Sequence, residues 1–305
     1  MMTNLSSSVV TIDCHYLKPK FAAAFLLIHK GRATFIENNT THAVPHLLNA
    51  LEKYEIQPEK VDYLIVTHAH LDHAGGTSAL LDQFKNAKVV AHPKAAKTLC
   101  SPERLIQSAK KVYGSGPFEK LYGEIKPLPE TRVLRVKDGE SLTWGERKFS
   151  FIYTLGHASH HICVHDSATE GVFTGDAFGL YYPEIQGKDL FILPSTSPID
   201  YDPIEAKKSV EAILNLHPKT LFLTHFGEVS RVQEAKNELL KNLDIHEALY
   251  HWAKANLQLG DELSKVVENR LKNTYSNRAQ FLKLDLELNA QGIAFAARKP
   301  VSQGL

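Results

Sequence analysis

Hydrophobic residues in the first two thirds of the chain form short apolar runs that alternate with helical repeats. The runs are rich in Val, Ile, Leu and Phe, which is typical of β-strands. They fall at residues 9–12, 22–28, 33–36, 61–67, 88–91, 132–136, 148–153, 161–165, 171–174 and 220–224. Helical spacing predicts helices at residues 41–54, 75–84, 93–113 and 203–216, and residues 114–130 are expected to form a loop. This part of the chain therefore combines strands and helices.

The pattern changes at about residue 229, beyond which no strand-like run occurs and charged residues alternate with Leu. Apolar residues recur at helical spacing in three stretches, at residues 239–252, 263–271 and 281–288. We therefore divide the chain into a domain of residues 1–228 and a helical extension of residues 229–305. The apolar faces of these helices must be covered by the main domain, by each other or by a second subunit, so a homodimer is one expected state.

The 305 residues include 35 Lys and Arg against 34 Asp and Glu, a formal charge of +1. This balance argues against a nucleic-acid partner, which requires a concentrated basic surface. The longest apolar run, residues 21–28, is far shorter than the ~20 residues of a membrane-spanning helix. The first residues lack a basic segment followed by an apolar one, and the three Cys residues are widely spaced. We therefore expect a cytoplasmic protein with reduced cysteines.

Histidine is unusually frequent, with 16 residues, and several of them cluster in one stretch. Residues 67–76 read THAHLDHAGG, at the end of the apolar run 61–67. Three His at these fixed offsets arise by chance roughly 0.04 times in such a chain. Alternate residues of an extended chain share a face, so His68 and His70 are expected to lie on one side, with Asp72 and His73 where the chain turns. Imidazole nitrogens and carboxylate oxygens are ligands for Zn²⁺ and similar ions.

Three more metal-binding side chains follow predicted strands later in the chain. They are His157 after residues 148–153, Asp176 after residues 171–174, and His225 after residues 220–224. A residue at the end of a buried strand can present its side chain at the sheet edge while the strand backbone stays paired. Since four ligands in one loop cannot complete two metal shells, we expect these three to join them.

The order HxHxDH, His, Asp, His resembles the metallo-β-lactamase superfamily, and the segments TLGHASHH (154–161) and FTGDAFG (173–179) resemble its glyoxalase II branch. The resemblance covers residues 1–228, and the extension resembles that of the quinolone-signal response protein. It implies an α/β fold, an αββα sandwich with the site at the shared edge of the sheets. It also implies two divalent metal ions, with zinc preferred over iron or manganese. His68, His70 and His157 would bind one ion, Asp72, His73 and His225 the other, and Asp176 would bridge them.

The activity implied is hydrolysis of a small ester, thioester or lactone, with Asp72, His73 and Asp176 as catalytic residues of the centre. Two divalent ions, two carboxylates and a hydroxide leave a net charge of about +1 when the imidazoles are neutral, which favours an oxyanion. A metal ion lowers the pKa of bound water towards about 7, so hydroxide would be available to attack a carbonyl carbon. The expected partner is a small molecule.

Three further side chains are candidates for contact with the substrate or with a metal ligand. His161 follows His157 within one motif, and Tyr181 and Tyr182 follow Asp176 closely. A hydrogen bond from such groups can orient a ligand or bind a substrate carbonyl.

Two other functions stay open on the sequence. Persulfide dioxygenases are similar at these motifs yet use a single iron held by two His and an Asp, which would make the protein an oxidoreductase. A regulatory, thioesterase-like protein whose role does not depend only on turnover is the other alternative. By contrast, class B1 β-lactamases end this loop motif in Asp-Arg, whereas His73 follows Asp72 here. Quorum-signal lactonases have Tyr at the position of Gly179. The first difference disfavours β-lactamase activity. The second makes lactonase activity less favoured but leaves it open, since Tyr181 could take the place of that Tyr.

Overall fold

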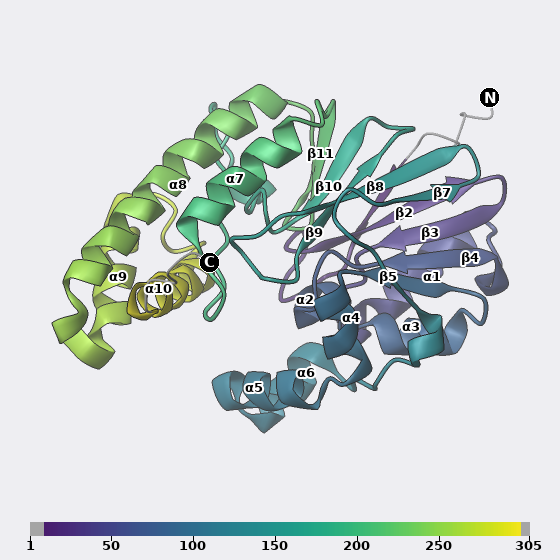
Figure 1. Ribbon diagram of the computed structural model, residues 1–305, viewed down its shortest axis with the longest axis horizontal. Coiled ribbons are helices and arrows are strands. Elements are labelled where there is room, and N and C mark those ends of the chain that lie inside the picture. Colours follow the sequence, from purple (N-terminus) through teal and green to yellow (C-terminus); the bar gives the residue numbers. More distant parts are fainter. Residues whose placement is uncertain (1–8, 300–305) are drawn as a thin grey trace.

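The computed structural model of the chain describes residues 9–299 and shows two sheets packed face to face with helices outside them (Figure 1). The αββα arrangement expected from the family resemblance is confirmed. Residues 1–8, where no signal sequence is predicted, and residues 300–305, at the end of the predicted extension, lie outside the described residues.

Each sheet has six strands within the described residues. The first sheet contains, in spatial order, β1 (Val9–Asp13), β2 (Ala23–His29), β3 (Arg32–Ile36), β4 (Val61–Ile65), β5 (Lys88–Ala91) and β6 (Val133–Arg135). The second sheet contains, in spatial order, β12 (Gly227–Val229), β11 (Thr220–Leu223), β10 (Gly171–Gly175), β9 (Ile162–Asp166), β8 (Arg147–Tyr153) and β7 (Ser141–Trp144). Strands β3 to β6 are parallel to one another, as is the pair β10 and β11, whereas the other neighbours are antiparallel.

The helices fall on the two outer faces and in the C-terminal extension (Figure 1). They are α1 (Val44–Lys53), α2 (Leu71–Ala74), α3 (Thr77–Gln83), α4 (Pro93–Cys100), α5 (Glu103–Tyr113), α6 (Ser115–Tyr122), α7 (Pro203–Leu214), α8 (Val232–Ala255), α9 (Leu263–Thr274) and α10 (Lys283–Arg298). The three helices predicted beyond residue 229 are present as α8, α9 and α10.

Two expectations about local structure are wrong. Residues 114–130 are not all loop, because α6 occupies part of them. Its Ser-Gly-Pro start is typical of a turn, yet Pro117 lies in the first helical turn, where the missing N–H has no cost. Phe118 and Tyr122, four residues apart, are both buried and fix this helix. The edge strands β7 and β12 were not predicted, since each is short and has few apolar residues.

Three apolar layers hold the sandwich together. Phe25, Phe149 and Phe173 belong to the layer between the two sheets. Leu47 of α1 packs with the outer face of the first sheet, and Val210 of α7 packs with that of the second. Full burial of one such side chain contributes about 1.5–3 kcal/mol to the free energy of folding. The site is therefore built on a rigid support.

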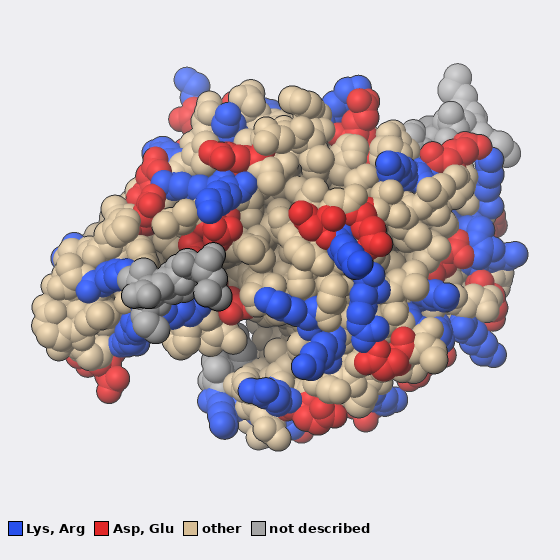
Figure 2. Space-filling model, in the orientation of Figure 1, with Lys and Arg blue, Asp and Glu red and all other residues tan. Residues whose placement is uncertain are grey.

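The helices of the extension cover their apolar faces on one another and on loops of the sandwich. Leu263, Leu286 and Ile293 are fully buried in one cluster with Phe21 and Tyr182 from the sandwich. Among the described helices, none combines the length and the apolar composition that a membrane crossing requires. On the face shown in Figure 2, Lys and Arg lie among Asp and Glu with uncharged surface between them.

Helix α8 carries a fully buried histidine, His246, whose two ring nitrogens make no hydrogen bond within residues 9–299. Burial lowers the pKa of His246 to about 3 from its ordinary value of 6.5. Below pH 6.5 the unfolded chain therefore binds a proton that the folded protein excludes, so this residue makes stability fall as the pH falls. The loss is about 1.4 kcal/mol for each pH unit below 6.5, until the folded-state pKa is reached.

We predict that His246→Leu gains about 2 kcal/mol of stability relative to wild type when the pH is changed from 7.5 to 5. Urea unfolding at the two pH values measures this difference. His251→Leu, on the exposed side of the same helix, is the matched control and should show no such gain. A stability difference between His246→Leu and wild type that is the same at both pH values would contradict the prediction.

Candidate metal centre

The ends of four strands meet at one edge of the sandwich, where the two sheets are joined by backbone hydrogen bonds. The N–H of Ile162 donates to the carbonyl of Thr67 at 2.8 Å, and the N–H of Ala23 donates to that of Thr224 at 2.8 Å. Each bond links one sheet to the chain leaving a strand of the other. The loops beyond these strands carry all the predicted donors: His68, His70, Asp72, His73, His157, Asp176 and His225.

Three imidazoles form the first group of donors. The His68 Nε2 lies 2.8 Å from the His70 Nδ1, and the His157 Nε2 lies 3.0 Å from the same atom. The ligand atoms of the three residues all lie within 4.8 Å of one another. This is the set expected to bind one metal ion.

Asp72, His73 and His225 form the second group, again with ligand atoms within 4.8 Å of one another. The Asp72 Oδ2 lies 3.6 Å from the His225 Nε2 and 4.0 Å from the His73 Nε2. His73 and His225 are buried, whereas the Asp72 side chain is 28% exposed. The second group is therefore reached from solvent past Asp72.

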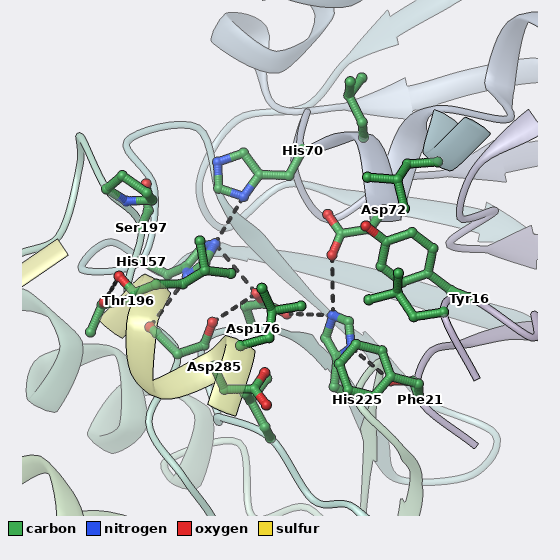
Figure 3. Close-up of a pocket in the computed structure, with 18 of the residues that line it drawn as sticks. Tyr16, Phe21, His70, Asp72, His157, Asp176, Thr196, Ser197, His225 and Asp285 are labelled. Atoms are coloured by element: carbon green, nitrogen blue, oxygen red, sulfur yellow. Dashed lines mark hydrogen bonds and ion pairs between the residues drawn. The ribbon is translucent and has the colours of Figure 1, made fainter. Parts of the chain in front are cut away.

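The Asp176 carboxylate lies between the two groups (Figure 3). Its Oδ1 is 3.2 Å from the His73 Nε2 and 3.6 Å from the His225 Nε2. Its Oδ2 is 3.4 Å from the His157 Nε2. One carboxylate oxygen thus faces each group, which is the placement expected of a bridging ligand.

The pKa values and the hydrogen bonds of the donor residues both favour a bound cation. Burial and the neighbouring imidazoles hold the pKa of His68 well below its ordinary value, and burial lowers the pKa of His70 to about 3. Both therefore offer lone pairs at neutral pH. Burial also acts on His73, but Asp176, Glu37 and Asp72 outweigh it and raise the pKa of His73 well above its ordinary value. Among the described residues the buried His73 Nε2 and Asp176 Oδ1 make no hydrogen bond of regular geometry, although they lie 3.2 Å from one another. A positive ion is the species this set favours.

Hydrogen bonds on the outer side of three imidazoles fix which nitrogen faces the centre. The Nδ1–H of His73 donates to the Glu37 Oε2 at 2.6 Å. The Nδ1–H of His225 donates to the carbonyl of Phe21 at 2.8 Å, and that of His157 donates to the carbonyl of Ser195 at 3.3 Å. When these rings are neutral, each Nε2 has its lone pair towards the centre, the arrangement usual for metal-binding His.

The three side chains predicted to contact substrate or ligands lie in different surroundings. His161 is fully buried, and its Nε2 accepts from the backbone N–H of Asp176 at 3.2 Å. Tyr182 lines the cavity beside the centre. The side chain of Tyr181 instead packs on the apolar cluster between the second sheet and α7 and α8, away from the residues that line the cavity.

Glycine is required next to His161. Gly175 has φ +49, and a Cβ there would lie 2.5 Å from the His161 Nε2 and 2.6 Å from the Thr67 Oγ1. The glycine lets β10 approach these side chains closely. It thus brings Asp176 up to the centre.

Two buried carboxylates near the centre, Glu37 and Asp285, were not predicted. Glu37 follows β3 directly and also accepts from the backbone N–H of Thr67 at 2.8 Å. Its position after a strand matches that of the predicted donors, so the same rule could have found it. Asp285 of α10 lines the cavity at the centre and is 7% exposed. It comes from the helical extension, where helical spacing gives no sign of a role in the site.

The metal-binding arrangement and the fold agree with comparisons to known proteins. The sequence model of the Metallo-beta-lactamase superfamily matches residues 32–225. The chain therefore belongs to the metallo-beta-lactamase superfamily.

Several relatives and solved structures are similar to this chain. The metallo-beta-lactamase fold-containing protein ST1585 of Sulfurisphaera tokodaii is 34% identical over 61% of this chain and 72% of its own. The crystal structure of ST1585 has a TM-score of 0.67, with 24% identity over 94% of this chain and 98% of that one.

Two relatives have names that state an activity. An acyl-coenzyme A thioesterase, MBLAC2 of Bos taurus, is 27% identical over 37% of this chain and 39% of its own. A hydroxyacylglutathione hydrolase of Aeromonas salmonicida (strain A449) is 24% identical over 50% of this chain and 44% of its own. The chain thus matches less than half the length of each of these two enzymes.

We predict that Glu37→Gln weakens zinc binding by about 10- to 100-fold, because the amide polarises the His73 ring less than the carboxylate does. Competition between the metal-free protein and a chromogenic chelator measures the affinity. Glu52→Gln, an exposed residue of α1, removes the same charge and should leave the affinity unchanged. Equal affinities of Glu37→Gln and wild type would show that Glu37 does not support His73 as a ligand.

Proposed function

We propose that the protein is a dinuclear metal-dependent hydrolase of a small ester, thioester or lactone. The observation that carries this proposal is the position of Asp176, with one carboxylate oxygen towards each of two groups of three donors. In this assignment His68, His70 and His157 hold one ion, Asp72, His73 and His225 hold the other, and Asp176 bridges them. Divalent ions there would supply Lewis-acid chemistry and a lower pKa for water.

The protein's own residues orient this chemistry. His70, Asp72 and Asp176 line a cavity of about 380 Å³, so a substrate in the cavity meets both groups of donors (Figure 3). The Ser195 Oγ–H donates to the Asp176 Oδ2 at 3.0 Å and holds the carboxylate in its central position. Phe21 and Tyr182 stack at 4.7 Å between ring centroids and both lie beside His225, which limits water on that side.

Among the three bond types we favour the thioester. Two relatives whose names state an activity, the acyl-coenzyme A thioesterase and the hydroxyacylglutathione hydrolase, act on thioesters. The cavity wall is largely apolar, with Leu71, Leu105 and Leu121 from α2, α5 and α6 and Leu284 and Leu288 from α10. Such a wall suits an acyl chain.

Iron-dependent oxidation is the second candidate function, and one observation favours it. The ligand atoms of His68, His73 and Asp176 also lie within 4.8 Å of one another. Two His and one carboxylate are the usual ligands of mononuclear non-haem iron. The metal content of the purified protein separates the two candidates.

We predict that protein purified without added metal contains two zinc-like ions per chain and releases thiol from acyl thioesters without oxygen uptake. Elemental analysis, a thiol reagent and an oxygen electrode provide the three measurements. One iron per chain with oxygen uptake would instead support the second candidate.

We also predict that His68→Ala and Asp176→Ala lose bound metal and hydrolysis together, because each removes a side chain from the centre. His251→Ala, an exposed histidine in α8, is the matched control and should retain both. Metal content and thiol release are measured on the same preparations. Full metal content in both site variants would contradict the ligand assignment.

A further inference from the structure

Ser195 lies in the segment between β10 and α7 and contacts two of the metal-binding side chains. Its Oγ–H donates to the Asp176 Oδ2 at 3.0 Å. Its carbonyl accepts from the His157 Nδ1–H at 3.3 Å. The Asp176 Oδ2 in turn lies 3.4 Å from the His157 Nε2. The position of Ser195 therefore affects both the carboxylate and the imidazole on this side of the centre.

Asn289 of α10 holds the two residues that flank Ser195. Its Oδ1 accepts from the N–H of Thr196 at 2.9 Å, and its Nδ2 donates to the carbonyl of Pro194 at 2.8 Å. One planar amide thus pairs with a backbone donor on one side of Ser195 and a backbone acceptor on the other. The Asn289 side chain is 2% exposed, so solvent has little access to either hydrogen bond.

Helix α10 is a fixed support for this amide. Leu286 and Ile293 are fully buried in the cluster that joins the extension to the sandwich. The Thr196 Oγ1–H donates to the Asn289 carbonyl at 3.2 Å. A Cβ on Gly292 would lie 2.3 Å from the Thr196 Oγ1, so the helix backbone packs closely against the segment. The amide and the segment therefore have little freedom to move apart.

The backbone around Ser195 has few other polar contacts. Within the described residues, the backbone of residues 194–199 makes hydrogen bonds to two other residues, Asn289 and His157. Without the Asn289 amide, the contact with His157 would be the one left, and His157 is itself a residue that the segment orients. The amide is thus the main polar contact that fixes Ser195 from outside the metal centre.

A second buried asparagine of the extension, Asn242 of α8, contacts the same stretch of chain at an earlier residue. Its side chain is 1% exposed, and its Nδ2 donates to the carbonyl of Ile192 at 2.8 Å. The next residue, Leu193, is paired with Leu180 through two backbone hydrogen bonds of 2.8 and 3.1 Å. This pair separates the Asn242 contact from Ser195. Asn242 therefore resembles Asn289 in burial and bonding but does not hold the neighbours of Ser195.

We propose that Asn289 is a positioning residue of the metal centre. Its amide holds Pro194 and Thr196, and thereby places Ser195 so that it fixes the Asp176 carboxylate and the His157 ring. A residue of the helical extension is then required for the geometry of donors that all belong to the sandwich. This inference rests on the ligand assignment of the proposed function, although not on the reaction that the centre catalyses.

The first test measures the zinc affinity of the metal-free protein by competition with a chromogenic chelator. Asn289→Ala and Ser195→Ala should each weaken zinc binding by about 10-fold, at the lower end of the effects typical for groups that orient a metal ligand. The variant with both substitutions should bind zinc at least about threefold more tightly than the product of the two single effects predicts. Residues that act through one network are not additive in this way.

Asn242→Ala is the matched control. Like Asn289→Ala, it removes a buried amide, so both variants should lower the free energy of unfolding in urea to a similar extent. Asn242→Ala should nevertheless keep its zinc affinity within about twofold of wild type. If the cavity left by Asn289→Ala prevents folding, Asn289→Leu provides the same test, because it keeps much of the side-chain volume and removes both hydrogen bonds.

Three outcomes would overturn the positioning role. They are a zinc affinity of Asn289→Ala equal to that of wild type, single effects that multiply in the variant with both substitutions, and an equal loss of affinity in Asn242→Ala. The last outcome would mean that zinc binding follows the general stability of the extension. None of these measurements requires a substrate, so the inference can hold or fail whether or not any ester is hydrolysed.

A second test uses no metal at all and so separates this inference from the proposed function. In ¹⁵N NMR spectra of metal-free protein with labelled histidine, wild-type His157 should carry its proton on Nδ1, the atom that donates to the Ser195 carbonyl. Its signals are identified by their absence in His157→Gln. Asn289→Ala should show a mixture of the two tautomers, whereas Asn242→Ala should keep the wild-type signal. An unchanged His157 signal in Asn289→Ala would overturn the inference, even in a protein that binds zinc.

Discussion

The structure depends on gathering imidazoles and carboxylates where little water reaches them. His68 and His73 are fully buried and Asp176 nearly so, and such groups are costly to bury unless each polar atom has a partner. The protein supplies partners to the outer nitrogens of three imidazoles, from Glu37 and from backbone carbonyls, and one donor to Asp176, the Ser195 Oγ–H. The inward-facing atoms are left to one another and to a positive charge. The need of these inward-facing atoms for a positively charged partner defines the chemistry of the site.

The two-sheet architecture holds such a cluster of buried polar groups in place. Each donor follows a strand whose backbone is paired and whose side chains are packed, so the adjacent loop needs few further contacts to be held in place. The hydrogen bonds from Ile162 to Thr67 and from Ala23 to Thr224 join the sheets close to the donors. The spacing between the two groups of donors is thereby set by the packing of the sandwich, which side-chain motion changes little.

Much of this was predictable because the patterns are local. Apolar runs gave ten of the twelve strands of the described chain, and the rule of a donor after a strand gave the seven residues that converge. What was not predictable depends on contacts between distant segments. The position of Glu37 after a strand marks it as a candidate, but its role as the partner of His73 is set by a contact across the fold. Helix α6 depends in the same way on the burial of Phe118 and Tyr122. The contact of Glu37 leaves no periodic signal in the sequence, and one apolar pair four residues apart in α6 is too short a repeat to predict a helix.

Asp285 is the clearest case of this limit, and it shows how the site divides its work. The donors all come from the sandwich, whereas Asp285 and part of the apolar wall come from α10. Asn289 and Gly292 of the same helix pack against the loop that carries Ser197. A change in the extension can therefore alter the shape and polarity of the cavity. The metal-binding donors and part of the cavity wall thus come from separate parts of one chain.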